Sequence, residues 1–229
     1  MKIKDLHRWR LTPKAAVDLQ KKFAAKIQTN FKKLNAEKIK KVAGVDVSFR
    51  GKMSCAAICV YSYPDMAIIE EVILVMKTVF PYIPGLLSFR EGPVVIKCFK
   101  KLKNAPDVIL FDAQGIAHPR RLGLASHIGL WLDRPSVGCA KTPLFGTFEM
   151  PGPCKGSYSF IKDKDEIIGA VLRTKDNTKP NFVSQGYKIR LEDAITITLS
   201  LCTKFKIPEP LRRAHSLSKA TLADEMKNL

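Results

Sequence analysis

The chain lacks the features of a secreted or membrane-bound protein. Its 229 residues contain no uncharged apolar run of about 18 residues, the length that a membrane-spanning helix needs. The polar start, residues 1–5, has no apolar region of the kind that signal peptides carry. These absences predict a protein that stays in the cytoplasm and does not bind a membrane.

Cysteine pairs are also missing. None of the six cysteines forms a CxxC pair or a Cys/His cluster of zinc spacing, and Cys55, Cys59, Cys98 and Cys202 lie in apolar runs. They are predicted to be reduced core residues rather than a disulfide framework or a metal site. No internal repeat or low-complexity segment is visible, and 46% of the residues are hydrophobic. We therefore expect a single domain over residues 1–229, acting as a monomer.

Acidic residues are scarce relative to basic ones. The 21 Asp and Glu stand against 39 Lys and Arg, which gives a formal net charge of +18. Clustered Lys and Arg gain free energy from counterion release along a phosphate backbone, so nucleic acid is the expected partner. An acidic membrane surface and a merely solvated basic surface are the alternatives.

Hydrophobic periodicity predicts an α/β fold. The expected strands lie at residues 42–49, 53–63, 66–80, 108–111, 136–140, 166–173 and 181–184, and the expected helices at 14–41, 93–103, 119–132, 191–204 and 216–226. The first helix is Lys-rich and long. Short turns between the first three strands predict an antiparallel meander, and the later alternation with helices predicts parallel strands. This order is typical of ribonuclease H-like domains, in which helices flank a mixed central sheet.

Two carboxylates stand in apolar strands. Asp46 lies in the middle of residues 42–49, and Asp112 directly follows residues 108–111. A lone carboxylate there is costly unless something pairs with it, and ligands approach the carboxyl ends of parallel strands. Glu91 can supply a third carboxylate. Three oxygen donors suit Mg²⁺ and the hydrolysis of a phosphodiester by an activated water, although each acid alone could be a paired structural carboxylate.

Basic residues flank these acids in the sequence. Arg120 and Arg121 follow Pro119, where a predicted helix N-terminus is a natural place for a phosphate. Lys141 follows a predicted strand and could reach a phosphate or the attacking water, and His215 could assist near a metal-bound water. Ordinary surface positions remain the alternative for both. Of the remaining histidines, His127 is expected to be a core residue.

The segment from Pro81 to Glu91 joins a stiff loop to a charged end. Pro81 and Pro84 fix φ and remove backbone donors, so Tyr82 and Ile83 are held on a rigid bracket. Such a loop can push a base out of a nucleic-acid stack, next to Glu91, the acid that could take part in the chemistry. A plain connecting loop whose tyrosine packs on the protein is the alternative.

These motifs resemble those of endonuclease V, the deoxyinosine 3′ endonuclease family. The resemblance covers most of residues 42–216 and is carried by residues 44–47, 81–91, 115–127, 138–141 and 213–215. It implies a ribonuclease H-like fold in which Asp46, Glu91 and Asp112 form the acidic metal site. Lys141 and His215 would be auxiliary groups at the metal and the scissile phosphate.

The resemblance also implies an activity. It is the Mg²⁺-dependent hydrolysis, with Mn²⁺ as a possible substitute, of the second phosphodiester bond 3′ of inosine in DNA or RNA, leaving a 3′-hydroxyl and a 5′-phosphate. The wedge would consist of Pro81, Tyr82, Ile83 and Pro84, with Tyr82 filling the gap left by the flipped base. The base pocket would be formed by Gly85, Leu87, His118 and Gly123.

One residue departs from the family pattern. Ala113 follows Asp112, where the family usually has glycine, and its methyl group disfavours a positive φ. A change in activity or substrate preference is therefore expected. Two other functions stay open: a non-catalytic binder of inosine-bearing or branched nucleic acid, which Ala113 favours, and a junction-type nuclease on the same fold.

Overall fold

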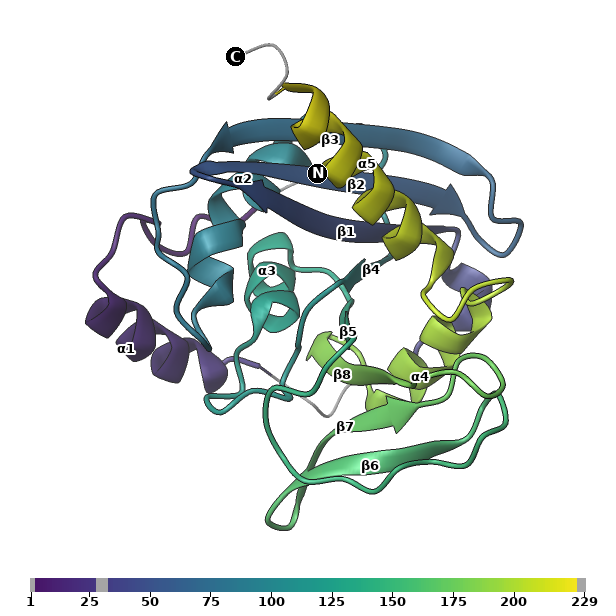
Figure 1. Cartoon of the computed structure of the whole chain (residues 1–229). Helices are drawn as coiled ribbons and strands as arrows, with labels where there is room; N and C mark the ends of the chain where they lie inside the picture. Colours follow the sequence, from purple (N-terminus) through teal and green to yellow (C-terminus); the bar gives the residue numbers. More distant parts are fainter. Residues whose placement is uncertain (1–2, 28–32, 226–229) are drawn as a thin grey trace.

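A computed structural model describes residues 3–27 and 33–225 of the chain (Figure 1). In this part, eight strands form one sheet with the order β3-β2-β1-β4-β5-β8-β7-β6. The strands are β1 (Lys41–Arg50), β2 (Met53–Ser62), β3 (Ile68–Lys77), β4 (Val108–Phe111), β5 (Ser136–Ala140), β6 (Tyr158–Asp163), β7 (Glu166–Leu172) and β8 (Asn181–Tyr187). The helices are α1 (Pro13–Ala24), the short 3-10 helix η1 (Ala36–Lys38), α2 (Leu87–Lys101), α3 (Leu124–Leu132), α4 (Leu191–Ser200) and α5 (Glu209–Glu225).

The sheet is mixed, as the sequence predicts. Strands β1, β2 and β3 form the antiparallel meander, whereas β4 runs parallel to both β1 and β5. The far edge, β8-β7-β6, is antiparallel again. Strand β6 was not predicted, because only Ile161 in it is buried and its sequence lacks the apolar alternation of a half-buried strand.

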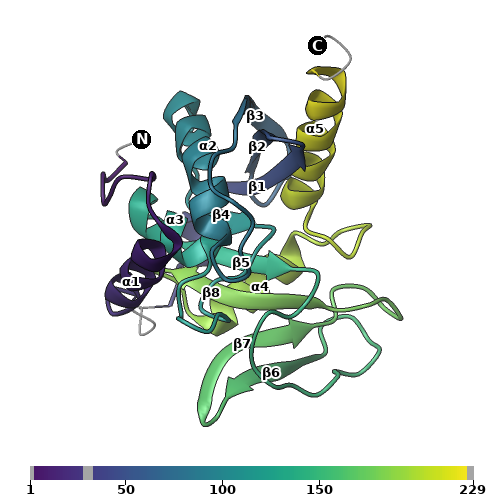
Figure 2. The ribbon, with the colours of Figure 1, turned by 60° about the vertical axis from the view of Figure 1, so that its left-hand side comes forward.

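Helices cover both faces of the sheet. Figure 2 shows α2 and α3 on one side of β1–β3 and α5 on the other. Each face has its own core: Ile58 and Val94 belong to the α2/α3 side, and Tyr61 and Leu211 to the α5 side. Gly44 lets α5 approach β1 closely, because a Cβ atom there would lie 2.2 Å from the backbone carbon of Pro210.

Several predicted helix boundaries were wrong. The long helix at residues 14–41 is instead the 12-residue α1, which ends at Ala24, and Lys41 already belongs to β1. Residues 28–32 of that prediction lie outside the described part. Helix α2 begins at Leu87, so Pro93 is inside it rather than at its start. Helix α3 begins only at Leu124, after a turn in which Arg121 has a positive φ of 54°.

The C-terminal prediction was wrong at one boundary with a functional consequence. Helix α5 begins at Glu209 rather than at residue 216, because a proline such as Pro210 is tolerated in a first helical turn. His215 therefore projects from a helix packed on β1. All six cysteines are free, and Cys55, Cys59, Cys98 and Cys202 are buried as predicted. Within the described residues, no helix has the length and apolar character needed to cross a bilayer.

Candidate functional site

Three side chains from distant parts of the chain meet at the junction of β1, β4 and α5. The ligand atoms of Asp46, Asp112 and His215 all lie within 4.8 Å of one another. The meeting follows from the topology: β1 and β4 are parallel neighbours, and the amide of Asp112 donates to the carbonyl of Val45 over 3.2 Å. Two carboxylates and an imidazole fit a divalent cation that prefers oxygen ligands and accepts nitrogen, such as Mg²⁺ or Mn²⁺.

Asp46 is held by hydroxyl groups as well as by the imidazole. Nδ1 of His215 lies 3.1 Å from its Oδ2 atom, and the Ser218 hydroxyl donates to the same oxygen over 2.8 Å. The Ser48 hydroxyl lies 2.8 Å from that of Ser218. A hydroxyl has one proton, and a carboxylate is the strongest acceptor in reach, so Ser218 donates to Asp46 and accepts from Ser48. Ser218, which no sequence argument singled out, is fully buried.

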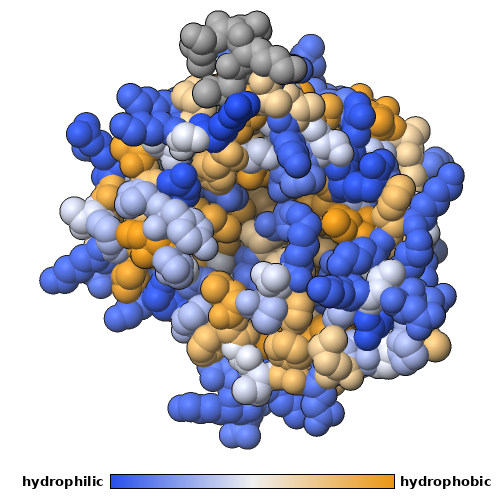
Figure 3. Space-filling model, in the orientation of Figure 1, coloured by the Kyte–Doolittle hydropathy of each residue, from blue (hydrophilic) through white to orange (hydrophobic). Residues whose placement is uncertain are grey.

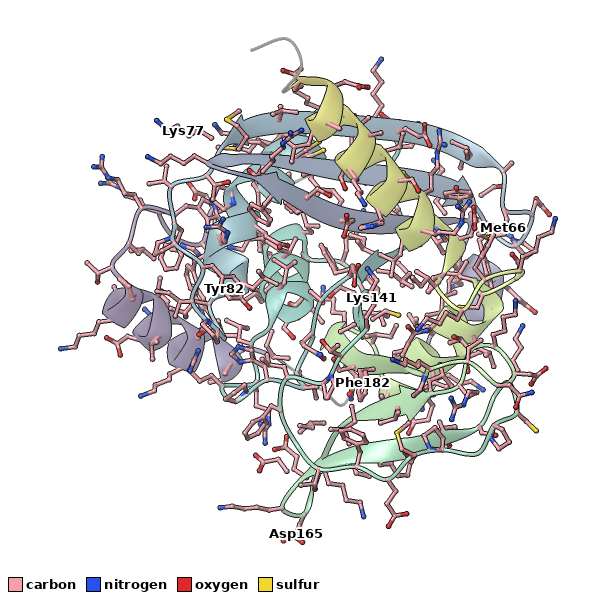
Figure 4. All side chains as sticks on the ribbon, viewed as in Figure 1. Met66, Lys77, Tyr82, Lys141, Asp165 and Phe182 are labelled. Atoms are coloured by element: carbon pink, nitrogen blue, oxygen red, sulfur yellow. The ribbon has the colours of Figure 1, made fainter. Side chains whose placement is uncertain are left out.

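Asp112 is paired with a cation. The Lys141 ammonium group donates to its Oδ2 atom. Burial nevertheless raises the pKa of Asp112, and Lys141 opposes this effect. Figure 4 shows Lys141 near the centre of the molecule, where β5 ends. The structure thus brings Lys141 to one of the two aspartates.

Glu91 lies beside this cluster and does not belong to it. Its side chain is 8% exposed, and it forms no hydrogen bond or ion pair with any residue in the described ranges. Burial raises the pKa of Glu91 well above its ordinary value, and the charges of Asp46 and Asp112 raise it further. The third group that the structure brings to the two aspartates is therefore His215, with Glu91 close enough to be affected by their charge.

A pocket of about 310 Å³ opens next to the cluster. Asp112 and Lys141 line it from one side and the loop before α2 from the other. The four residues predicted for a base pocket, Gly85, Leu87, His118 and Gly123, all line it, together with Tyr82, Ile83 and Pro84. Tyr82 is 69% exposed, which rules out the interpretation of a tyrosine packed on the protein (Figure 4).

The carbonyl of Gly85 is the fixed point of this loop. Three donors converge on it: Nε2 of Gln20 at 2.8 Å, Nε2 of His118 at 2.9 Å and Nη2 of Arg120 at 3.0 Å. Gly85 has a positive φ of 78°, which favours glycine, and a Cβ atom there would lie 2.8 Å from Nη2 of Arg120 and would displace that group. Gln20, from α1, also accepts from Nε of Arg120 over 2.6 Å.

The proton positions of His118 follow from its partners. A carbonyl only accepts, so Nε2 carries the proton that goes to Gly85, and Nδ1 accepts from the backbone amide of Arg120 over 3.1 Å. The imidazole is neutral in this arrangement. Burial, together with the nearby charges of Arg120 and Arg121, lowers the pKa of His118 to about 4, although the hydrogen bond to Gly85 opposes this change.

The two arginines predicted to contact phosphate are engaged elsewhere. Arg120 supports the loop at Gly85, and Arg121 forms ion pairs with Asp163 at 2.5 Å and with Glu166 at 2.7 Å. Both contacts favour a structural role over phosphate binding. His127 is a buried core residue, as expected.

Ala113 causes no backbone strain. Its φ is not positive, and its side chain is buried at the pocket wall. The conformation that the missing glycine would have permitted is not used at this position. The methyl group therefore changes the lining of the pocket rather than its backbone.

Comparisons with known proteins agree with this geometry. The family model for endonuclease V matches residues 21–216. An endonuclease V from Methanothrix thermoacetophila is 47% identical over 218 residues, covering 95% of this chain and 96% of the relative. The chain belongs to the endonuclease V family. It is accordingly a nuclease, a phosphodiester hydrolase with the ribonuclease H-like fold of endonuclease V structures.

Two endonuclease V structures place the chain within the family in three dimensions. The crystal structure from Bacillus subtilis is 31% identical, covers 100% of both chains and has a TM-score of 0.95. The structure from Ciona intestinalis is 28% identical, covers 92% of this chain and 98% of that one, and has a TM-score of 0.80. It was determined in complex with a 24-mer DNA that contains an inosine followed by a ribo-adenosine.

Proposed function

We propose that this protein is a Mg²⁺-dependent endonuclease that recognises inosine in a nucleic acid strand. It would hydrolyse the second phosphodiester bond on the 3′ side and leave a 3′-hydroxyl and a 5′-phosphate. The observation that carries the proposal is the shared wall: Asp112 and Lys141 line the same pocket as Tyr82 and Gly85. The complex of the Ciona intestinalis relative with inosine-containing DNA supports the choice of base.

The acidic cluster would perform the hydrolysis. Asp46 and Asp112 would hold Mg²⁺, or Mn²⁺ in its place, with Glu91 as a third carboxylate next to them and His215 at the edge of the site. When bound, the ion would lower the pKa of a water and neutralise charge on the departing oxygen. Lys141 would neutralise Asp112 and contact the scissile phosphate, and the exposed His215 would move a proton at the site.

The loop before α2 would expose the base to the site. Pro81 to Pro84 would act as the wedge, and the exposed Tyr82 ring would fill the space that the flipped hypoxanthine leaves in the stack. Gly85 and Leu87 would present backbone groups to the base. Gly123 would belong to the pocket wall, where it lets two backbone segments pack closely, because a Cβ atom there would lie 2.3 Å from the carbonyl oxygen of Gln114. The positions of these backbone groups, and with them the recognition of the base, would depend on how firmly the carbonyl of Gly85 is held.

Cleavage of oligonucleotides tests the proposal. A strand with one inosine, as DNA and as RNA, is compared with an adenosine strand, with and without Mg²⁺. We expect a single cut at the second bond 3′ of inosine. Asp112→Asn should lose about 10²-fold or more of the cleavage rate, because it removes a carboxylate that would hold the ion that stabilises the transition state. Binding of the inosine strand should persist in the variant. Full cleavage by both Asp112→Asn and Asp46→Asn would contradict the metal assignment.

The wedge has a separate test. Tyr82→Ala should lower the preference for inosine over adenosine more than it lowers overall binding, since base stacking on an aromatic ring contributes about 1–3 kcal/mol. The measurement is kcat/KM on the two strands together with their Kd values. An unchanged preference would show that Tyr82 does not contact the nucleic acid.

The same proposal includes how the chain works. It would act as a single ribonuclease H-like domain, since the one sheet runs from β3 to β6 without a break. It would act as a monomer. It would act in the cytoplasm, where free cysteines such as the five buried ones stay reduced.

A further inference from the structure

A second cavity lies on the other side of the loop that precedes α2. Its volume is about 470 Å³. The residues after β3, the N-terminal segment around Trp9 and one face of α2 enclose it. Among the residues that line it, only Pro81, at the start of the wedge, takes part in the proposed function.

The loop before α2 separates the two cavities. Phe80 and Pro81 line the second cavity, whereas Tyr82 and the residues up to Gly85 line the first. The loop is anchored on both sides: Nη1 of Arg90 donates to the carbonyl of Phe80 over 2.7 Å, and three donors hold the carbonyl of Gly85. In Figure 4, Lys77 and Lys141 lie on different sides of Tyr82. The loop is thus a fixed partition between two spaces.

The chemistry of the second cavity suits a nucleotide. Three cationic residues, Arg10, Lys77 and Arg90, line it, and no acidic residue does so within the described ranges. Its walls are otherwise mainly apolar. The Thr78 hydroxyl at its edge is buried and has no hydrogen-bond partner in the part of the chain that is described. Apolar walls, positive charge and a free hydroxyl match a flat base that carries a phosphodiester.

Hydrophilic and apolar side chains alternate over this side of the molecule. Figure 3 shows blue side chains projecting between apolar patches on the face that carries the wedge. Val79, next to the wedge, is 81% exposed and lines the second cavity. An exposed valine beside three cations gives apolar contact to a ligand without hindering its phosphate.

We propose that this second cavity holds the base that loses its partner when inosine leaves a duplex. The inference rests on the proposed function, in which the loop separates the strands. Inosine would enter the cavity beside Asp112, and the opposite base, on the other side of the partition, would enter the cavity beside Val79. Sheltering that base offsets part of the free energy that unstacking and unpairing cost. The second cavity then acts on duplex substrates alone.

The test uses Val79→Asp, which places a carboxylate at the mouth of the cavity on an exposed side chain. Ile68→Asp is the matched control, because Ile68 lies at the other end of β3, is 52% exposed and receives the same charge. Three substrates are compared: a duplex with one inosine opposite cytidine, the same duplex with an abasic site opposite inosine, and the single strand. Kd is measured without metal, and cleavage under single-turnover conditions with Mg²⁺.

We expect Val79→Asp to weaken binding and cleavage of the base-containing duplex about tenfold relative to Ile68→Asp, in line with the loss of one stacked base. On the abasic duplex and the single strand, the two variants should be equal. An equal loss on all three substrates, or no loss on any, would overturn the inference. Failure of the proposed function is distinct: the unaltered protein would then not cut the inosine single strand, while the Kd comparison would still decide the role of the cavity.

Discussion

The acidic cluster and the base pocket share Asp112 but are built in opposite ways. The cluster joins two carboxylates and an imidazole from β1, the end of β4 and α5, and the imidazole, that of His215, belongs to a side chain that is 48% exposed. At the corner of the pocket, the carbonyl of Gly85 accepts hydrogen bonds from three side chains. One of them, His118, is 2% exposed. The difference teaches that the chemistry needs charge within reach of solvent, whereas the recognition surface needs a backbone that cannot move.

Acid should weaken the pocket corner through His118. Its pKa is about 4 in the folded protein and 6.5 when the imidazole is exposed. Below pH 6.5 the imidazole of His118 binds a proton in the unfolded chain but not in the folded protein. The contribution of the neutral imidazole to the free energy of unfolding is therefore complete above pH 6.5 and is lost as the pH falls toward 4. The loss reaches about 3 kcal/mol near pH 4.

The measurement is urea unfolding of the native protein and of His118→Gln at neutral pH and near pH 4. Glutamine retains a donor for Gly85 and does not titrate, and all other ionisable groups are shared by the two proteins. The stability of the variant should therefore fall less with pH, by about the amount just given. Parallel pH profiles would show that His118 does not stay neutral in the folded protein.

The hydroxyl behind Asp46 should affect the cluster and leave the pocket unchanged. Ser218→Ala removes the donor to Asp46, and such supporting hydrogen bonds typically change metal affinity or activity by about 10–100-fold. We expect the Mg²⁺ concentration for half-maximal cleavage to rise within that range. Binding of an inosine strand without metal should not change.

Ser216→Ala is the matched control. Ser216 lies on the same helix, is exposed, and donates only to the carbonyl of Arg212 in the described structure. Its metal dependence should equal that of the unaltered protein. If both variants have the same Mg²⁺ dependence, the hydroxyl of Ser218 contributes to the packing of α5 and does not support Asp46.

The sequence predicts the aspartates of the cluster better than the side chains that hold the cluster and the loop in place. Asp46 and Asp112 stand out because a carboxylate in an apolar strand needs a reason, and the strand order already places β1 beside β4. Ser218 and Gln20 do not stand out, because a serine or glutamine in an amphipathic helix is ordinary, and their partners lie 172 and 65 residues away. Such contacts depend on how α5 and α1 dock, which local periodicity does not encode.

Helix boundaries were missed for a related reason. Pro93 was taken as a helix start, yet α2 begins at Leu87 because the anchored Gly85 turn already sets the first residues in helical geometry. The consequence is functional: Glu91 projects from inside a helix that starts at the pocket, so its place relative to Asp46 depends on that turn. The wedge and the start of the helix that carries Glu91 therefore share one anchored turn, whereas the groups of the cluster come from other elements.

The smallest expected effect comes from Gln20 of α1, which helps to hold the loop at Gly85. Gln20→Met keeps the volume of the side chain and removes one of three donors to Gly85. It also removes the acceptor for Arg120 and a donor to the carbonyl of Leu122. A net hydrogen bond contributes about 1 kcal/mol, so the ratio of kcat/KM for inosine over adenosine should fall about fivefold. The Mg²⁺ requirement should stay the same, because no ligand of the cluster contacts Gln20.

Lys22→Met provides the control on the same helix, because Lys22 is exposed on α1. It should keep the selectivity of the unaltered protein. A lower selectivity in Gln20→Met alone, with an unchanged Mg²⁺ dependence, would show that a side chain of α1 positions the recognition loop. If Gln20→Met instead changed the Mg²⁺ dependence and kept full selectivity, the prediction would be wrong. The loop and the acidic cluster would then move together, and Gly85 would not be held in place.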